Sequence, residues 1–224
     1  MLHAPHELNY EEQVMQSTKR KIPFSIKLLF TAFMAVLVPF YWKTYGPSNF
    51  LYFCDVALFL TLIGVWTENK LLISLPAVGI LVPQFFWVID FIGGLFGFPP
   101  IGMTEYMFDT NIPLFARGLS LFHGWLPFLL IYLVYKIGYD KRAFKWWTIT
   151  AWVLMATCYF LMPAPGMVLE NINAPVNINY VYGFSDAAPQ TWMNPNLYFM
   201  TLMFALPVFV YYPTSRALQF VFKK

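Results

Sequence analysis

The sequence predicts an all-α integral membrane protein, a polytopic bundle of about six transmembrane helices with both termini in the cytoplasm. Apolar runs of about 20 residues recur along the 224-residue chain, and each is long enough to cross a hydrocarbon core of roughly 30 Å. The composition agrees, because 59% of the residues are hydrophobic and only 11% are charged, which is not the balance of a soluble domain. We therefore expect a multi-pass protein of the cell membrane, in a bacterium the inner membrane.

The apolar runs also define the expected domains. Residues 1–22 form a polar cytoplasmic arm, residues 23–213 the transmembrane domain and residues 214–224 a basic cytoplasmic tail. The polar start of the chain does not resemble a cleavable signal, so we expect the first apolar run to be retained. The expected spans are residues 24–42, 50–66, 71–92, 111–135, 146–162 and 197–212.

Turn-forming residues separate these spans. Residues 46–49 make a short turn, and residues 68–70 make a tight connection. Two longer connections, residues 93–112 and 163–196, are rich in glycine, proline or asparagine, and this topology places both on the outer side. The second of them is positioned to cap the bundle.

The distribution of basic residues sets the orientation. With the amino terminus inside, all of the 14 lysines and arginines except Lys43 and Arg117 fall on the cytoplasmic side. The net charge of +3 does not indicate nucleic-acid binding, because the basic residues stand beside membrane spans. We expect membrane lipid as a partner and no nucleic acid.

The predicted span at residues 111–135 carries a polar notch. Arg117, Ser120 and His123 lie within two turns, and Pro127 follows. An arginine at the centre of a spanning helix costs roughly 2.5 to 3.5 kcal/mol on insertion scales, so such groups usually face a partner or a wet cavity. Pro127 has no amide proton for the carbonyl of His123, so we expect the helix to bend there.

The topology brings further polar residues to the same level. Cys54 and Asp55 lie near the outer end of the second span, and Asp90 lies near the outer end of the third. These three residues can converge with the notch in the outer half of the bundle. Asn179 and Tyr180, in the outer connection, lie on the same side.

Each of these residues also has a structural interpretation. Arg117 can form an ion pair with Asp55 or Asp90 that neutralises buried charge. Cys54 can be a small packing residue, or can pair with Cys158 in a disulfide.

The histidine of the polar notch and the two residues of the outer connection also have simple structural interpretations. His123 can simply bond to Ser120 or to a backbone carbonyl. Asn179 and Tyr180 can shape a turn. These alternatives stay open at the level of sequence.

Several cofactor chemistries lack ligands. Two cysteines cannot supply a four-cysteine iron–sulfur cluster, and one histidine within the spans cannot provide bis-histidine haem ligation or a multi-histidine metal centre. We expect no cofactor.

Three stretches carry a family resemblance. They are NFLYFCDVALFL with the following TENKLL, the LFHGWLP of the fourth span, and NINYVYGF followed by PQTWMNPNLYF. Together they resemble the YwaF-like family of polytopic membrane proteins, which is similar to an animal transmembrane phospholipid acyltransferase. The resemblance covers residues 48–212 and implies acyl transfer by Cys54 and His123. One departure is Tyr52, where family members often have a histidine.

The resemblance implies a lipid-handling, thiol-dependent acyltransferase. A cysteine attacks an ester only as its thiolate, so His123 would take the proton. Asp55 or Asp90 would orient the imidazole, and Arg117 would hold a lipid phosphate. Two alternatives come from other classes: a non-catalytic accessory subunit of a respiratory or photosynthetic membrane complex, and a small transporter that uses the buried charges.

Overall fold

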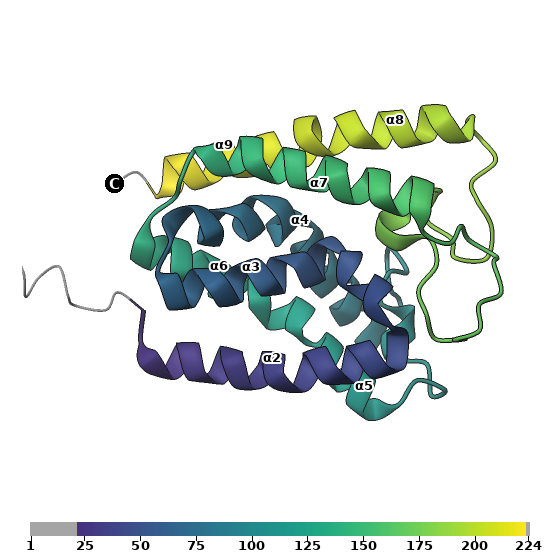
Figure 1. Cartoon of the computed structure of the whole chain (residues 1–224), viewed down its shortest axis with the longest axis horizontal. Coiled ribbons are helices and arrows are strands. Elements are labelled where there is room, and N and C mark those ends of the chain that lie inside the picture. The colour runs from purple at the N-terminus through teal and green to yellow at the C-terminus, as the bar shows by residue number, and fades with distance from the viewer. Residues whose placement is uncertain (1–21, 223–224) are drawn as a thin grey trace, which may run out of the picture.

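A computed structural model describes residues 22–222, and this part of the chain is built from helices without strands. The long helices lie roughly along one axis (Figure 1). Residues 1–21 of the expected arm, and Lys223 and Lys224 of the expected tail, lie outside the described residues. The helices are α2 (Phe24–Tyr45), α3 (Phe53–Thr67), α4 (Lys70–Leu95), α5 (Leu114–Ser120), α6 (Phe122–Ile137), α7 (Arg142–Leu161), α8 (Pro195–Ala205) and α9 (Tyr212–Val221), with 3₁₀ turns η1 (Pro47–Leu51), η2 (Glu105–Met107) and η3 (Ile178–Tyr180) and a π-helical turn η4 (Leu206–Tyr211).

Four helical stretches of the described part are long and apolar enough to cross a membrane. They are Phe24–Tyr45, Lys70–Leu95, Leu114–Ile137 and Pro195–Val221. Two other predicted spans differ from these. Helix α3 has 15 residues and is about 22 Å long at 1.5 Å per residue, because η1 takes up the start of the predicted span. Helix α7 has 20 residues but includes several tryptophans and threonines.

The two ends of the bundle differ in their connections and charge. Helix α2 begins at the end where α9 finishes, and the loops that follow α4 and α7 lie at the opposite end (Figure 1). The first end carries Lys70, Lys136, Lys141, Arg142 and Arg216, whereas the loops at the other end carry Glu105, Asp109, Glu170 and Asp186. Helix α9 continues to Val221, so the segment predicted as a basic tail is largely helical.

Helix α4 is the centre of the bundle. It packs against α3, α6, α7 and α9, and every residue from 73 to 81 is buried. Pro76 and Pro83 lie inside this helix. Prolines are tolerated in a membrane helix when neighbouring helices surround the backbone groups they leave free.

The crossing of α4 and α7 depends on one small residue. Gly79 faces the fully buried indole of Trp147, and a Cβ added at Gly79 would overlap that ring. Small residues let membrane helices approach closely enough to gain van der Waals contact. The glycine therefore sets how near α7 lies to the central helix.

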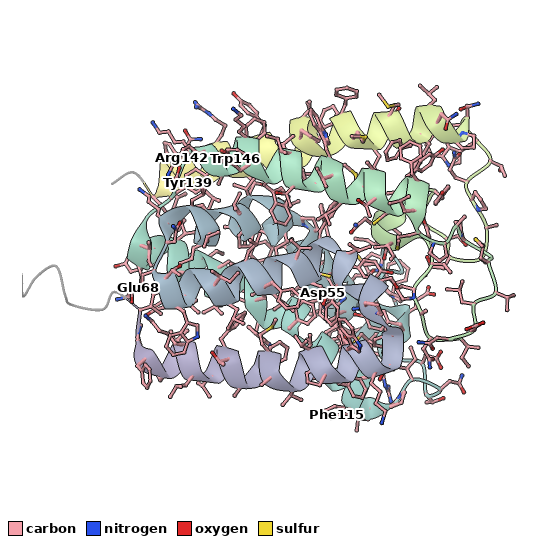
Figure 2. The ribbon with its side chains drawn as sticks, in the orientation of Figure 1. Asp55, Glu68, Phe115, Tyr139, Arg142 and Trp146 are labelled. Atoms are coloured by element: carbon pink, nitrogen blue, oxygen red, sulfur yellow. The ribbon has the colours of Figure 1, made fainter. Side chains whose placement is uncertain are left out.

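An ion pair ties the start of α2 to the turn between α3 and α4. The Lys27 Nζ lies 2.7 Å from the Glu68 Oε1, and the lysine is 4% exposed. Glu68 has φ +51°, the left-handed conformation that ends α3. Figure 2 shows Glu68 at this end of the bundle, away from Asp55. The pair neutralises a buried cation, as such groups require.

We predict that Gly79→Ala destabilises the protein. The new methyl group has no room beside Trp147, and overpacking of this kind typically costs about 1–3 kcal/mol. The thermal unfolding midpoint in detergent micelles should therefore fall. Gly118→Ala is the matched control, because no atom lies within 4 Å of its added Cβ. Equal midpoints for the two variants would contradict this description of the helix crossing.

Candidate functional site

The first part of the site is a thiol cluster of Asn49, Cys54 and Asp55 at the beginning of α3. The half-buried Cys54 thiol donates to the Asp55 Oδ2 at 3.8 Å, and the Asn49 Nδ2 donates to the same oxygen at 3.4 Å. Asp55 is only 2% exposed, and its Oδ1 has no hydrogen-bond partner among the described residues. Figure 2 shows this carboxylate inside the bundle, toward the end with the long loops. A buried carboxylate thus stands directly beside a free thiol.

Asn179 clamps the beginning of α3 from the loop after α7. Its Oδ1 accepts the backbone N–H of Phe53 at 3.0 Å, and its Nδ2 donates to the carbonyl of Leu51 at 2.9 Å. The same Nδ2 lies 3.5 Å from the Cys158 Sγ. The clamp satisfies backbone groups at a helix start that would otherwise be unpaired. Asn179, which the sequence predicted to bind or orient at the site or else to shape a turn, therefore fixes the helix that carries Cys54.

A second asparagine makes the same loop rigid. The Asn177 Nδ2 donates to the carbonyls of Gly183 and Ser185, and its Oδ1 accepts the N–H of Tyr182 at 3.0 Å. Asn177, Asn179 and Tyr180 all have φ between +50° and +59°. Such left-handed residues persist where surrounding bonds hold them, and the buried asparagine supplies those bonds.

Burial also affects the phenol of Tyr180. It raises the pKa of Tyr180 to about 12, and the nearby carboxyl of Asp186 acts in the same direction. The phenol is therefore protonated at neutral pH.

The second part of the site is a hydroxyl cluster of Tyr41, Ser120 and Tyr106. The Tyr41 hydroxyl lies 3.2 Å from the Ser120 Oγ, and Tyr106 also interacts with Ser120. Trp87 Nε1 donates to the Tyr106 hydroxyl at 3.1 Å. Burial raises the pKa of Tyr106, so this phenol stays protonated and can donate.

The two clusters are neighbours. Tyr41 interacts electrostatically with both Asp55 and Cys54, and Tyr106 interacts in the same way with Cys54. Tyr41 of α2 and Tyr106 of the loop containing η2 therefore lie near the start of α3 as well as near Ser120. The predicted convergence in the outer half of the bundle therefore includes Cys54, Asp55 and Ser120, with two tyrosines among them.

His123 explains where the fourth span is interrupted. Its Nδ1 donates to the carbonyl of Ser120 at 2.8 Å, the carbonyl that the N–H of Gly124 would take in a regular helix. Gly124 bonds to Leu121 instead, at 2.9 Å. The break between α5 and α6 therefore lies at Leu121. Pro127, where we expect a bend, lies inside α6, which continues through that residue.

The imidazole is held by aromatic rings as well. His123 stacks between Trp87 and Phe122, with ring centroids at 5.2 and 4.0 Å. Since Nδ1 carries the proton, the neutral ring has its lone pair on Nε2. Among the described residues, Cys54 and His123 bond to different partners, Asp55 and Ser120. The predicted roles of the pair stay a prediction.

Asp90 belongs to a separate clamp. Its fully buried carboxylate accepts the N–H groups of Ile101, Gly102 and Thr104 and the Thr104 hydroxyl, at 2.6 to 3.0 Å. These four bonds fold the loop after α4 onto the end of that helix. Asp90 is thus committed to the loop, and no bond joins it to the imidazole of His123.

Arg117 does not form the ion pair that the sequence suggested. Among residues 22–222 it pairs with neither Asp55 nor Asp90, and its Nη1 donates to the carbonyl of Met107 at 3.1 Å. Its buried Nε has no hydrogen-bond partner there. Asp90 is already bonded by its loop, and the Arg117 guanidinium bonds to the carbonyl of Met107 while the Asp55 Oδ1 stays unpaired. The disulfide that the sequence left open is also absent, since Cys54 and Cys158 are both free thiols.

Sequence reasoning missed several members of the site. Tyr41 and Trp87 occur among the many aromatic residues of the spans, where nothing distinguishes a phenol or indole that makes a bond. Asn49 and Tyr106 lie in turns with no periodic pattern. A usable signal was present only for Asn177, which lies two residues before Asn179 in NINY.

The helical architecture is consistent with a membrane protein. Comparisons with known proteins found no relative of the chain. No model of a known protein family, no curated protein and no solved structure matches the chain. The resemblance to the YwaF-like family, and the acyltransferase activity that it implies, therefore remain predictions.

We predict that Asn179→Ala exposes Cys54. Each buried backbone group left unpaired costs about 1–3 kcal/mol, so the first turn of α3 should open more often and Cys54 should react faster with N-ethylmaleimide. Mass spectrometry of the alkylated peptide measures the rate. Asn173→Ala, an exposed position in the same loop, is the control. If Asn179→Ala and the control react at the wild-type rate, Asn179 is not a clamp.

Proposed function

We propose that the chain is a six-span membrane protein, with both termini cytoplasmic, that transfers acyl groups between lipids through a thioester on Cys54. The four long apolar helices support the membrane part, and α3 and α7 complete the six spans. Basic residues at one end of the bundle and acidic loops at the other support the orientation. Membrane lipid is then the substrate.

The bond from Cys54 to Asp55 is the observation that carries the proposed chemistry. A thiol must lose its proton before it can attack an ester carbonyl, and the neighbouring carboxylate already accepts that thiol's hydrogen bond. The free Oδ1 of Asp55 gives a second position for the proton. Asp55 therefore takes the part of the base that the family resemblance gives to His123.

The reaction has two balanced steps. Asp55 takes the thiol proton, and the Cys54 thiolate attacks the carbonyl carbon of a lipid ester. The bond from carbon to the ester oxygen breaks, the lysolipid leaves with the proton from Asp55, and the acyl group stays on the sulfur as a thioester. In the second step an acceptor hydroxyl loses its proton to Asp55 and attacks the thioester, which restores the thiol.

His123 acts as a positioning residue in this proposal. Its bond to the Ser120 carbonyl creates the break between α5 and α6. The break orients Ser120 toward Tyr41, so two protonated hydroxyls lie beside the thiol cluster. Hydroxyls of this kind are suitable donors for an oxyanion that develops at the attacked carbonyl.

We predict that purified wild-type protein becomes acylated on Cys54 when it is incubated with a phospholipid that carries a deuterated acyl chain. Mass spectrometry should find the label on the Cys54 peptide, and hydroxylamine should remove it. Cys54→Ser should carry no thioester, and Asp55→Asn should slow labelling by about 100-fold or more, the usual contribution of a general base.

Cys158→Ala is the matched control for this experiment, because it removes the other thiol and should label at the wild-type rate. Absence of label from folded wild-type protein, or equal label transfer in Cys54→Ser, would refute acyl transfer. Stoichiometric co-purification with defined partners in mild detergent, together with no label, would support the non-catalytic accessory subunit.

A further inference from the structure

Arg117 is a cation without a counter-ion in the part of the chain that the structure describes. It makes one hydrogen bond among residues 22–222, to the carbonyl of Met107, and forms no ion pair with any of them. Its Nε is buried without a partner. Buried or intramembrane charges are costly unless an opposite charge or hydrogen bonds offset them. The side chain therefore lacks an anion.

An apolar groove lies on the same helix. Leu114, Phe115, Gly118 and Leu119 of α5 line a cavity of about 490 Å³. The Leu114 and Phe115 side chains are 77% and 54% exposed, and Figure 2 shows Phe115 at the outer margin of the bundle. No polar side chain lines this groove, so its shape and chemistry suit a hydrocarbon chain.

Helix geometry places Arg117 next to the groove along α5. Leu114 precedes Arg117 by three residues, and residues three apart are neighbours on a helix surface. Ser120 follows Arg117 by three residues and faces Tyr41 of the hydroxyl cluster. Arg117 therefore lies between the exposed groove and the side of α5 that faces the candidate site.

We propose that Arg117 and the α5 groove bind an anionic glycerophospholipid, whose phosphate takes the free guanidinium donors and whose acyl chain lies along Leu114, Phe115 and Gly118. A guanidinium matches phosphate oxygens with a planar set of donors. Arg117 lies beside an apolar groove, and α5 and α6 together are long enough to cross a membrane. This position suits the phosphate of a lipid better than a free phosphate ion. This site rests on the proposed function and names its substrate class.

The approach of Arg117 to the groove depends on the loop held by Asp90. Asp90 binds Thr104, and η2 follows directly with the Met107 carbonyl that holds the Arg117 Nη1. The guanidinium is therefore held through Nη1, and its buried Nε stays unpaired. Part of the entropy cost of ordering a long side chain is met before the lipid binds.

The test is native mass spectrometry of delipidated full-length protein with added dioleoyl phosphatidylglycerol, and with phosphatidylcholine of the same chains. We predict that phosphatidylglycerol binds more tightly and that Arg117→Gln weakens its binding by about tenfold or more, the scale of a lost charge-assisted hydrogen bond. Lys43→Gln removes an exposed charge at the same end of the bundle and should bind like the wild type.

A second variant keeps the test independent of charge. Gly118→Leu should fold normally, because no atom lies within 4 Å of a Cβ added at Gly118, but it fills the groove. It should weaken dioleoyl phosphatidylglycerol binding and leave binding of the dihexanoyl form, which needs less of the groove, close to wild type. Equal binding by Arg117→Gln and wild type, an equal loss in Lys43→Gln, or full displacement by inorganic phosphate would overturn the lipid site.

Cys54→Ser separates this inference from the proposed chemistry. The variant should bind phosphatidylglycerol like the wild type, since Cys54 takes no part in the groove. Lipid binding without any thioester in the wild type would leave the lipid site standing and refute acyl transfer. A Cys54 thioester in Arg117→Gln at the wild-type rate, together with unchanged lipid binding, would refute the lipid site alone.

Discussion

Two buried side chains, Asn179 and Asp90, hold together the end of this molecule that carries the long loops. Each reaches from its own segment to unpaired backbone groups of another: Asn179 to the start of α3, and Asp90 to the loop after α4. In an apolar bundle these backbone groups have few other partners, and leaving them unpaired is expensive. The position of the Cys54 thiol depends on the Asn179 clamp, because Cys54 directly follows the clamped start of α3. The position of the Arg117 guanidinium depends on the Asp90 clamp, because Arg117 bonds to the carbonyl of Met107 in the loop after α4.

The imidazole of His123 and the backbone N–H of Gly124 compete for the carbonyl of Ser120, and this competition determines where α5 ends and α6 begins. The imidazole of His123 donates to the carbonyl of Ser120, which would otherwise accept a backbone hydrogen bond of a regular helix. The helix is therefore interrupted at Leu121. As a result, α5 becomes a short separate helix that carries Arg117 and the groove on one side and Ser120 on another. A polar residue in a membrane helix thus changes the backbone geometry as well as the charge of the site. The same break brings the Ser120 hydroxyl to Tyr41 of α2.

The helical fold, and the convergence of several polar residues in one half of the bundle, could be predicted from the sequence because apolar periodicity and span direction decide them. The hydrogen-bond partners of each residue could not be predicted from the sequence. Charge alone favoured an ion pair between Arg117 and an aspartate, but Asp90 is satisfied by backbone N–H groups that have no signature in the sequence. Likewise Cys54 bonds to its own neighbour Asp55, and His123 bonds to the carbonyl of Ser120, only three residues earlier. Local bonds, which need no second helix to be correctly placed, are formed in preference to the long-range pairs expected from topology.

The most direct test of this account is hydrogen–deuterium exchange on Asp90→Ala, compared with the wild type in the same micelles. If the buried carboxylate holds the loop, the amides of Ile101, Gly102 and Thr104 should exchange much faster in the variant. The backbone around Asn177, in the other clamped loop, should keep its protection. Unchanged exchange at residues 101–104 would show that packing alone holds the loop, and would contradict the dependence of this end of the bundle on its buried side chains.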